Sequence, residues 1–452
     1  MSKGIRWQAQ YLGILFSLSL FFTGAVAAGA ADTPDMEDPS PDTADSAAAS
    51  TSPQLPPGVA TAGMNPQMAS GTTPAPQIPI TDGGPQLKQF DQIMQTIMGN
   101  YNVPGGALAI AKDGKLVLAR GYGYADLQNG RLFSPTTLFS MASVTKAVTG
   151  VAALRLVDEG RLNLDDTLYN ILGKPKLGNV QDPRVMTITV RQLLHHSAGW
   201  KTDFVGYDQP TYNSLTRNGP IPFETLLLFV MANKPLDYAP GAECHYSNFQ
   251  FGALKSVIEH ASGQNFETYV NEHVMQPMGV RDNRLEPERG IYLPNEAHRY
   301  SPVLRPLPGG HPNGQVTGSL GSWESSVVDM CKFLTAVDGT RTKPFLSKAS
   351  FDQMVAPVPA PVAVRENGST FGLGWDSVKT TPDGILFEKN GGVPGVHTYI
   401  EHLPNNVDWV VIFNGTGVDQ KPKVMGAALR SLHQALSDVK DWPQIDLFQR
   451  YQ

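Results

Sequence analysis

The sequence predicts an α+β fold in which one antiparallel sheet is flanked by terminal helices and carries an inserted, mostly helical subdomain. Strand-like segments stand near both ends of the folded region, and a helical pattern lies outside each set of strands. Between them, residues 165–330 alternate helical segments with Pro/Gly-rich loops. Because no internal repeat is visible, we expect these segments to form a single domain over residues 87–452.

Residues 1–31 have the pattern of an export signal. Lys3 and Arg6 form a charged start, residues 11–22 are apolar, and small residues that suit a cleavage site follow. Residues 12–31 are 20 uncharged residues, about enough to span a bilayer, so a retained anchor is the alternative. The second half of this stretch is only weakly apolar, which favours cleavage. We therefore predict an exported protein, periplasmic or secreted, that is tethered to a membrane only if the signal stays uncleaved.

Residues 32–86 are rich in Pro, Ala, Ser and Thr and have no periodic apolar pattern, which predicts a disordered linker. The chain of 452 residues carries a net charge of −6, and this linker contains seven acidic and no basic residues. The folded region is therefore close to neutral and has no basic run. We do not expect a nucleic-acid partner, because such proteins carry a basic patch or stripe.

The segments of the folded region follow in chain order. Apolar residues three to four positions apart predict a first, amphipathic helix: Leu87, Phe90, Ile93, Met94 and Ile97. "GALAIAKDGKLVLARGYG" predicts two strands joined by a tight turn at Asp113-Gly114. "TITVRQLLHHSAGW" predicts a helix that begins after a threonine cap and ends at Gly199. Strand patterns return in "FGLGWDSV", "GILFEKN", "HTYIEHL" and "DWVVIFNG", and residues 424–436 predict the last helix.

Ser143 and Lys146 lie in "FSMASVTKAVTG", just before an apolar helical stretch at residues 147–159. Their spacing places both side chains on one face of a helix. A serine hydroxyl needs a neighbouring base to become a nucleophile, and a lysine can be that base if desolvation or a nearby cation lowers its pKa. The alternative is a capping serine followed by a lysine that reaches solvent. A second Ser-x-x-Lys, from Ser437 to Lys440, lies in a polar tail and is interpreted as a chance match.

Two further motifs follow along the chain. Tyr246 and Asn248 precede an apolar helix in "ECHYSNFQFGAL", where a phenol can move a proton and an amide can bind a substrate carbonyl. Lys389 and Gly391 end a strand in "EKNGGVPG", and Gly392 follows where backbone must approach a ligand closely. Each motif alone is weak, but Ser-x-x-Lys, Tyr-x-Asn and Lys-x-Gly in this order and in these settings form one strong signal.

With these motifs, residues 87–436 resemble the superfamily of serine β-lactamases and penicillin-binding proteins. The Tyr-x-Asn form is similar to that of class C β-lactamases, D-alanyl-D-alanine carboxypeptidases and related esterases. The likeness extends to "VPGGALAIAKDGK", "VAALRLVDEGRLNLDD" and "LDYAPGAECHYSN". It implies a β-lactamase-like fold and an exported serine hydrolase that acts through an acyl-enzyme on an amide, lactam or ester carbonyl. The alternatives are a carboxylesterase of the same family and a penicillin-recognising binding module with little turnover.

The resemblance also implies roles for the residues of the three motifs. Ser143 would be the acylated nucleophile, Lys146 its proton partner, and Tyr246 a general base or acid. Asn248 would bind the substrate carbonyl. Lys389 would keep Tyr246 ionisable and attract a substrate carboxylate.

The same resemblance implies an oxyanion hole made by the backbone N–H groups of Ser143 and Gly392, the residue after Gly391. Asn390 departs from the family pattern, because a hydroxyl residue is expected there and commonly helps to hold a substrate carboxylate. Lys389 favours substrates with a carboxylate and Asn390 weakens that case, so the substrate class is open.

No metal and no cofactor is expected. The His195-His196 pair belongs to no H-E-x-x-H pattern, and the sequence contains no G-x-S-x-G and no phosphate-binding glycine motif. The predicted partner is a small-molecule or peptide substrate, with cell-wall fragments as one source, and the oligomeric state is open. Cys244 and Cys331 are either a disulfide of an exported protein or two buried thiols.

Overall fold

The computed structural model describes residues 78–205, 209–217, 219, 221–287, 290–310, 318–340, 343–362, 368–415 and 421–452, without the side chains of residues 421–423. The predicted signal peptide, and the predicted linker as far as residue 77, lie outside the described residues. Residues 78–86 belong to the folded unit, because Ile80 and Thr81 pair with Tyr122 and Gly121 at an edge of the main sheet. The predicted linker boundary at residue 86 is therefore too late, since a strand of two residues has no periodicity to detect.

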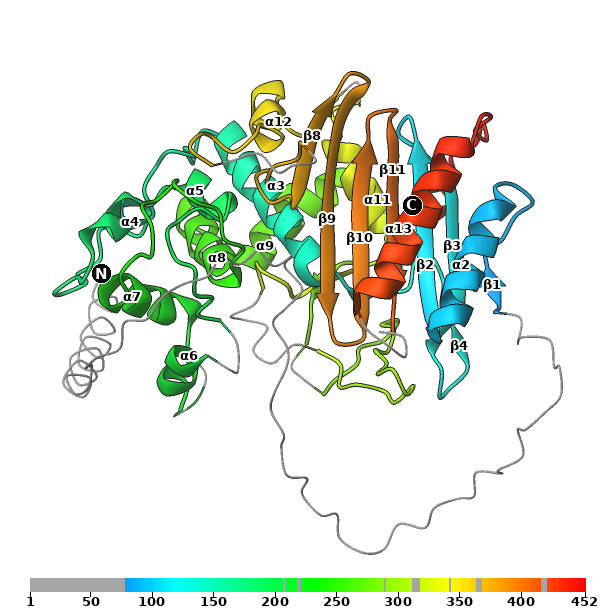
Figure 1. Cartoon of the computed structure of the whole chain (residues 1–452), viewed down its shortest axis with the longest axis horizontal. Coiled ribbons are helices and arrows are strands. Elements are labelled where there is room, and N and C mark those ends of the chain that lie inside the picture. Colours follow the sequence, from blue (N-terminus) through cyan, green and yellow to red (C-terminus); the bar gives the residue numbers. More distant parts are fainter. Residues whose placement is uncertain are drawn as a thin grey trace, which may run out of the picture. The chain divides into compact units, whose positions relative to one another are not determined.

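The main sheet is antiparallel, and its strands run in the order β1-β3-β2-β11-β10-β9-β8, with β4 paired to β3 (Figure 1). The strands are β1 (Ile80–Thr81), β2 (Gly105–Lys112), β3 (Lys115–Asp126), β4 (Arg131–Leu132), β8 (Ser377–Thr381), β9 (Gly384–Val393), β10 (Val396–Leu403) and β11 (Val407–Phe413). Strands from the two ends of the folded region meet inside the sheet, where Gly106 of β2 pairs with Phe413 of β11. This architecture confirms the predicted α+β class.

The helices of the described residues cover both faces of this sheet or form the inserted region. They are α2 (Lys88–Tyr101), α3 (Thr145–Asp158), α4 (Leu168–Ile171), α5 (Val190–Leu194), α6 (Pro210–Leu215), α7 (Phe223–Asn233), α8 (Asn248–Ser262), α9 (Phe266–Val270), α11 (Val327–Val337), α12 (Lys348–Met354) and α13 (Lys421–Asp438). The first and last of these, as predicted, pack together over one face, where Trp409 and Val411 are buried (Figure 1). Val410 and Ile412 point to the opposite face and join the core around α3 and α11. The two-residue period of a strand thus divides β11 between two apolar cores.

Within the described part of residues 165–330, helices α4 to α9 come first. They are followed by the short turns η3 (Asn271–Met275) and η4 (Gln276–Met278). Described residues further along this region contribute two strands to a small three-stranded sheet of order β5-β7-β6. Its strands are β5 (Phe139–Ser140), β6 (Arg284–Leu285) and β7 (Trp323–Ser325). Strand β5 of this small sheet directly precedes the short turn that leads into α3.

A glycine turn that leads into the outer strand β8 packs against α3. Gly374 has φ +94°, and a Cβ at this position would lie 2.7 Å from the carbonyl oxygen of Lys146. Only glycine therefore allows the turn to lie directly against the backbone of α3. The segment "FGLGWDSV", which the sequence predicted as a strand, is this turn followed by β8, which begins only at Ser377.

Two further observations within the described residues concern membrane-spanning helices and the two cysteines. Within the described ranges, no helix combines the length and the apolar character needed to cross a membrane. Cys244 is half-buried and Cys331 is buried inside α11, and both are thiols in the structure rather than the two halves of a disulfide.

Candidate active site

Ser143 lies in a short 3-10 turn, η1 (Ala142–Val144), that leads into α3. The turn is fixed from outside, because the backbone N–H of Met141 donates to the carbonyl of Trp323 at 2.7 Å. The Ser143 side chain caps neither the turn nor the helix. Its Oγ instead lies 3.1 Å from Nζ of Lys146 and 2.8 Å from the hydroxyl of Tyr246. The structure therefore excludes the capping alternative and brings the first two motifs together.

Lys146 is fully buried and its amine has three polar neighbours. Besides Ser143 Oγ, these are Oδ1 of Asn248 at 2.8 Å and the carbonyl oxygen of Leu320 at 2.5 Å. Burial, and secondly the nearby ammonium of Lys389, hold the pKa of Lys146 well below its ordinary value. A neutral amine has two N–H donors and one lone pair, and two of its three neighbours are pure acceptors. The lone pair is therefore left for the Ser143 hydroxyl, the one neighbour that can donate.

The loop that carries Leu320 is fixed along α3 by two threonines one turn apart. The backbone N–H of Trp323 donates to Oγ1 of Thr145 at 3.1 Å, and Oγ1 of Thr149 donates to the carbonyl of Ser319 at 2.7 Å. Oγ1 of Thr149 also lies 3.1 Å from the carbonyl of Thr145, the local partner that a threonine inside a helix commonly uses. The two bonds to the loop place the Leu320 carbonyl on the Lys146 amine.

Tyr246 donates its phenolic hydrogen to Ser143 Oγ. Burial, followed by the negative charge of Asp376, raises the pKa of Tyr246 above its usual range. The ring lies between two lysine amines, with Nζ of Lys146 5.0 Å and Nζ of Lys389 5.1 Å from its centroid. The raised pKa runs against the expectation that Lys389 keeps Tyr246 ionisable, which stays a prediction. Tyr246 is a proton donor at neutral pH.

His196 packs against the phenol. Its ring centroid lies 4.6 Å from that of Tyr246, and its Nδ1 accepts the backbone N–H of Ser247 at 3.2 Å. Burial, followed by the positive charge of Lys389, lowers the pKa of His196 well below its ordinary value, so the ring stays neutral. His196 thus holds the phenol from the side rather than taking part in proton transfer.

Asn248 has both ends of its amide engaged. Oδ1 accepts from Lys146, and Nδ2 donates to Oδ2 of Asp203 at 2.8 Å. Asp203 also accepts the backbone N–H groups of Asn248 at 3.1 Å and Phe249 at 2.8 Å. Its carboxylate thus binds the first two backbone N–H groups of α8. The prediction that Asn248 binds the substrate carbonyl differs from this geometry, in which the amide orients the Lys146 amine.

Lys389 also has its charge engaged within the protein. Only 1% of its side chain is exposed, and its Nζ forms an ion pair with Oδ1 of Asp376. The second oxygen of Asp376 accepts the backbone N–H of Asn390 at 3.2 Å and its side-chain amide at 3.0 Å. The expectation that Lys389 attracts a substrate carboxylate thus meets a competing carboxylate from the protein itself.

Strand β9 passes directly against the Ser143 turn. A Cβ on Gly391 would lie 2.4 Å from the carbonyl oxygen of Met141 and 3.0 Å from the backbone nitrogen of Ser143. A Cβ on Gly392, which is exposed, would meet nothing closer than the Val396 carbonyl oxygen at 3.6 Å. The close approach at Gly391 brings together the two backbone segments that the predicted oxyanion hole requires.

The two glycines give a matched test of this approach. Gly391→Ala is expected to lower kcat/KM for a short-chain p-nitrophenyl ester by at least about 100-fold, because the added methyl group pushes β9 away from the turn. Gly392→Ala has room for its methyl group and should cost less than about 10-fold. Steady-state kinetics of both variants provide the comparison, and equal losses would contradict the role given to the close approach.

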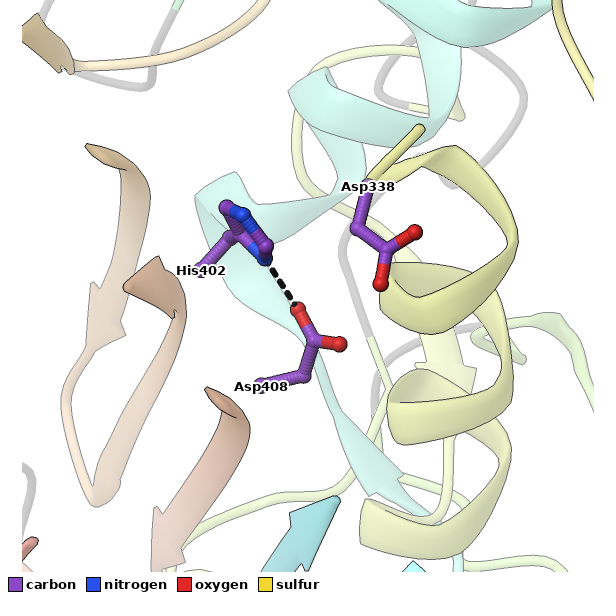
Figure 2. Close-up of side chains that lie close together, drawn as sticks. All are labelled: Asp338, His402 and Asp408. Atoms are coloured by element: carbon purple, nitrogen blue, oxygen red, sulfur yellow. Dashed lines mark hydrogen bonds and ion pairs between the residues drawn. The ribbon is translucent and has the colours of Figure 1, made fainter. Parts of the chain in front are cut away.

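Among the residues that the structure describes, one group of three side chains could ligate a metal: Asp338, His402 and Asp408, whose ligand atoms lie within 4.8 Å of one another (Figure 2). His402 Nδ1 and Asp408 Oδ1 are hydrogen-bonded at 2.8 Å, and Asp338 accepts the backbone N–H of Thr340 at 2.7 Å. Burial and the facing Asp408 carboxylate raise the pKa of Asp338 to about 7, so a shared proton can offset the repulsion of the two acids. Three donors are one fewer than structural zinc takes. We describe the group as a buried hydrogen-bonded cluster.

This cluster is separate from the Ser143 site. His402 stands five positions along β10 from His397, the residue that pairs with Gly392. At about 3.3 Å per residue this corresponds to roughly 16 Å along the strand. No part in the chemistry at Ser143 is therefore assigned to it.

Two carboxylates of the site, Asp203 and Asp376, were not predicted from the sequence. Asp203 precedes Asn248 by 45 residues, and nothing in its local pattern marks it. Asp376 directly follows the Gly-Leu-Gly-Trp turn, and a carboxylate next to a turn that contacts α3 is a signal that could have been noticed. Both carboxylates bind motif residues from other elements, which is information that motif spacing does not contain.

The geometry agrees with the comparison of the chain with protein families. The family model named Beta-lactamase matches residues 90–444. The chain belongs to the beta-lactamase family. This membership confirms the resemblance drawn from the three motifs, and it accounts for a single sheet that combines strands from both ends of the folded region.

Curated relatives within the family match part of their length. Protein flp of Staphylococcus aureus (strain MW2) is 33% identical over 195 residues, which are 43% of this chain and 37% of the relative. Esterase EstB of Burkholderia gladioli is 31% identical over 248 residues, which are 51% of this chain and 61% of the relative. The chain thus spans less than two thirds of the length of either relative.

Solved structures of the family share the fold. The octameric penicillin-binding protein homologue from Pyrococcus abyssi has a TM-score of 0.63 at 23% identity and covers 80% of each chain. A beta-lactamase/D-alanine carboxypeptidase from Pseudomonas syringae has a TM-score of 0.63 at 17% identity and covers 78% of this chain and 99% of its own. At these identities the likeness concerns the fold alone.

Proposed function

We propose that the protein is a serine hydrolase that forms an acyl-enzyme on Ser143 from an ester, amide or lactam substrate. The observation that carries the proposal is the set of contacts around the Lys146 amine. Two acceptors take its hydrogens, so its lone pair is available to the Ser143 hydroxyl, as a general base requires. The family and its named members, an esterase and carboxypeptidases among them, support a hydrolase.

In the acylation step, Lys146 accepts the hydroxyl proton while Ser143 Oγ forms a bond to the substrate carbonyl carbon. The carbonyl oxygen, now negative, is held by the backbone N–H groups of Ser143 and Gly392. When the bond to the leaving group breaks, Tyr246 donates its phenolic proton to that group. The ammonium of Lys146 then restores the proton of Tyr246, since both groups contact Ser143 Oγ.

In the deacylation step, a water molecule attacks the carbonyl carbon of the acyl-serine. Lys146, neutral again, accepts one proton of that water, and the bond between the carbon and Ser143 Oγ breaks. Tyr246 protonates the released Oγ and regains its proton from Lys146. The acid product leaves, and every group returns to the protonation state that the site favours by burial.

A binding module that is acylated but hardly turns over is the second candidate, because nothing in the described geometry sets the rate of deacylation. The decisive experiment incubates the protein with a fluorescent penicillin and, separately, with a short-chain p-nitrophenyl ester. Intact mass then reports the adduct, and product release reports turnover. Turnover of either reagent supports a hydrolase, a stable adduct on Ser143 without turnover supports the binding module, and no adduct with no turnover contradicts both.

Export to the periplasm or the medium stays part of this proposal. It rests on the signal-like residues 1–31, and cell-wall fragments in that compartment are one source of a suitable amide substrate.

A further inference from the structure

We propose that Asp376 is a specificity-determining residue that occupies the anion-binding position of this site and directs the enzyme to substrates without a carboxylate beside the scissile bond. The inference rests on the proposed acyl-enzyme function and adds a substrate class to it. It starts from three hydrogen-bond donors that converge on one internal carboxylate, beside the Ser143 turn.

The three donors belong to two consecutive residues of β9. Lys389 provides its ammonium, and Asn390 provides both its backbone N–H and its side-chain amide. An ammonium and an amide are the groups by which a protein would bind a substrate carboxylate. Here they are already bound to both oxygens of Asp376, so an incoming carboxylate would find the same donors occupied by a group of its own charge.

The burial of the pair makes displacement costly. The Lys389 side chain is 1% exposed and that of Asp376 is 16% exposed. Separating such a pair leaves one charge without a partner in a poorly solvated place, whereas a surface pair would be compensated by water. A substrate carboxylate would have to displace Asp376 or accept its repulsion, and a neutral group has neither cost.

Backbone contacts fix Asp376 in this position. Its N–H donates to the carbonyl of Glu388 at 3.0 Å, and the next residue, Ser377, pairs with Glu388 as β8 begins. On the other side, the glycine turn at residues 372–375 lies against α3. Because both neighbours are anchored, the carboxylate is a built part of the site rather than a mobile surface group.

The same arrangement explains why an asparagine suits position 390. An amide at this position can donate to Asp376 Oδ2 while its backbone N–H contacts the same oxygen. The departure from the hydroxyl expected in the family is thus matched by a carboxylate that uses the amide. Asn390 and Asp376 together fill the anion-binding position with a carboxylate of the protein itself.

The test compares isosteric substrates that differ only in charge. One pair is 3-carboxyphenyl butyrate with 3-carbamoylphenyl butyrate, which puts the charge on the leaving group. The other is p-nitrophenyl glutarate with its terminal amide, which puts the charge on the acyl group. For the wild type, kcat/KM is expected to favour the neutral member of at least one pair by 10-fold or more.

Asp376→Asn and Asp376→Ala should reduce this preference by at least 10-fold, because Lys389 then carries an uncompensated positive charge beside the substrate. The alanine variant covers the case in which asparagine still accepts a hydrogen bond from Lys389. Asp352→Asn is the matched control, since it removes one carboxylate from the exposed pair with Lys348 and should leave the preference unchanged. Circular-dichroism spectra and a cooperative melt above the assay temperature confirm that folded variants are compared, since loss of the buried pair with Lys389 is itself expected to lower the melting temperature.

The outcomes separate the inference from the proposed function. If Ser143 is acylated and turns over but the wild type shows no preference, or the preference survives in both Asp376 variants, the assignment of Asp376 is wrong while the hydrolase stands. If none of the four esters is hydrolysed or acylates Ser143, both the proposed function and this inference fail.

Discussion

Replacing Ser143 with alanine is expected to abolish turnover of every ester, amide or lactam substrate, with a loss of at least about 10⁴-fold in kcat. The loss follows from removal of the atom that forms the covalent intermediate. The fold should stay intact, because the hydroxyl caps neither η1 nor α3 and the loss of its contacts with Tyr246 and Lys146 should cost only about 1–3 kcal/mol. Steady-state rates, intact mass after incubation with substrate, and a thermal melt together check this result.

Ser437→Ala provides the control for Ser143→Ala. Ser437 begins the second Ser-x-x-Lys of the chain, and its hydroxyl donates to the carbonyl of Gln434 near the end of α13, exposed to solvent. This variant should retain full activity and should be labelled like the wild type. More than about one per cent residual activity in Ser143→Ala would place the nucleophile elsewhere.

Replacing Lys146 with arginine should be as damaging as replacing it with methionine, with a loss of at least about 10³-fold in kcat/KM for each. Arginine preserves the positive charge that the residue would have if it acted only by electrostatic attraction. A guanidinium, however, stays protonated in proteins and cannot accept the Ser143 proton. Wild-type-like activity of Lys146→Arg would contradict the role of Lys146 as a base.

The pH dependence of the wild type gives a second measure of this base. Burial, followed by the charge of Lys389, lowers the pKa of Lys146 well below its ordinary value, so the neutral amine forms at a lower pH than in an exposed lysine. Activity should therefore reach its plateau well below the ordinary lysine pKa and fall on the acid side, as pH drops through the lowered pKa and the amine gains a proton. A rate that rises steadily toward the ordinary lysine pKa of about 10.4 would show that the amine is not desolvated in solution.

Motif spacing predicted the part of the site that lies on single elements. The three-residue spacing of Ser143 and Lys146 is a property of a helix, and the structure confirms their contact. The sequence predicted a close backbone approach at Gly392, toward a ligand, whereas the tight contact in the structure is that of Gly391 with the Ser143 turn. The antiparallel sheet could likewise be predicted from alternating segments and turn residues.

Charge partners that come from different elements could not be predicted. Asp376 reaches Lys389 because Ser377 and Glu388 are paired in the β8–β9 register, and a register is not encoded in a motif. Asp203 reaches Asn248 through a loop with no repeating pattern. In the structure Asn248 contacts the Lys146 amine and Lys389 is paired with Asp376, while the roles predicted for them toward a substrate stay predictions. Burial, followed by the charge of Asp376, raises the pKa of Tyr246.

The position of β2 beside β11 also constrains how the protein folds. Residue 106 pairs with residue 413, so the sheet can close only after nearly the whole folded region has been synthesised. Contacts between such distant segments slow folding, because a long loop must be ordered before they form. Until β11 pairs with β2, the β2–β3 hairpin has one edge unpaired, and β9, which completes the site at Ser143, lies near the end of the folded region. Since α2 and α13 pack together, joining them by a short linker and opening the chain in a loop elsewhere would make this slow pairing local.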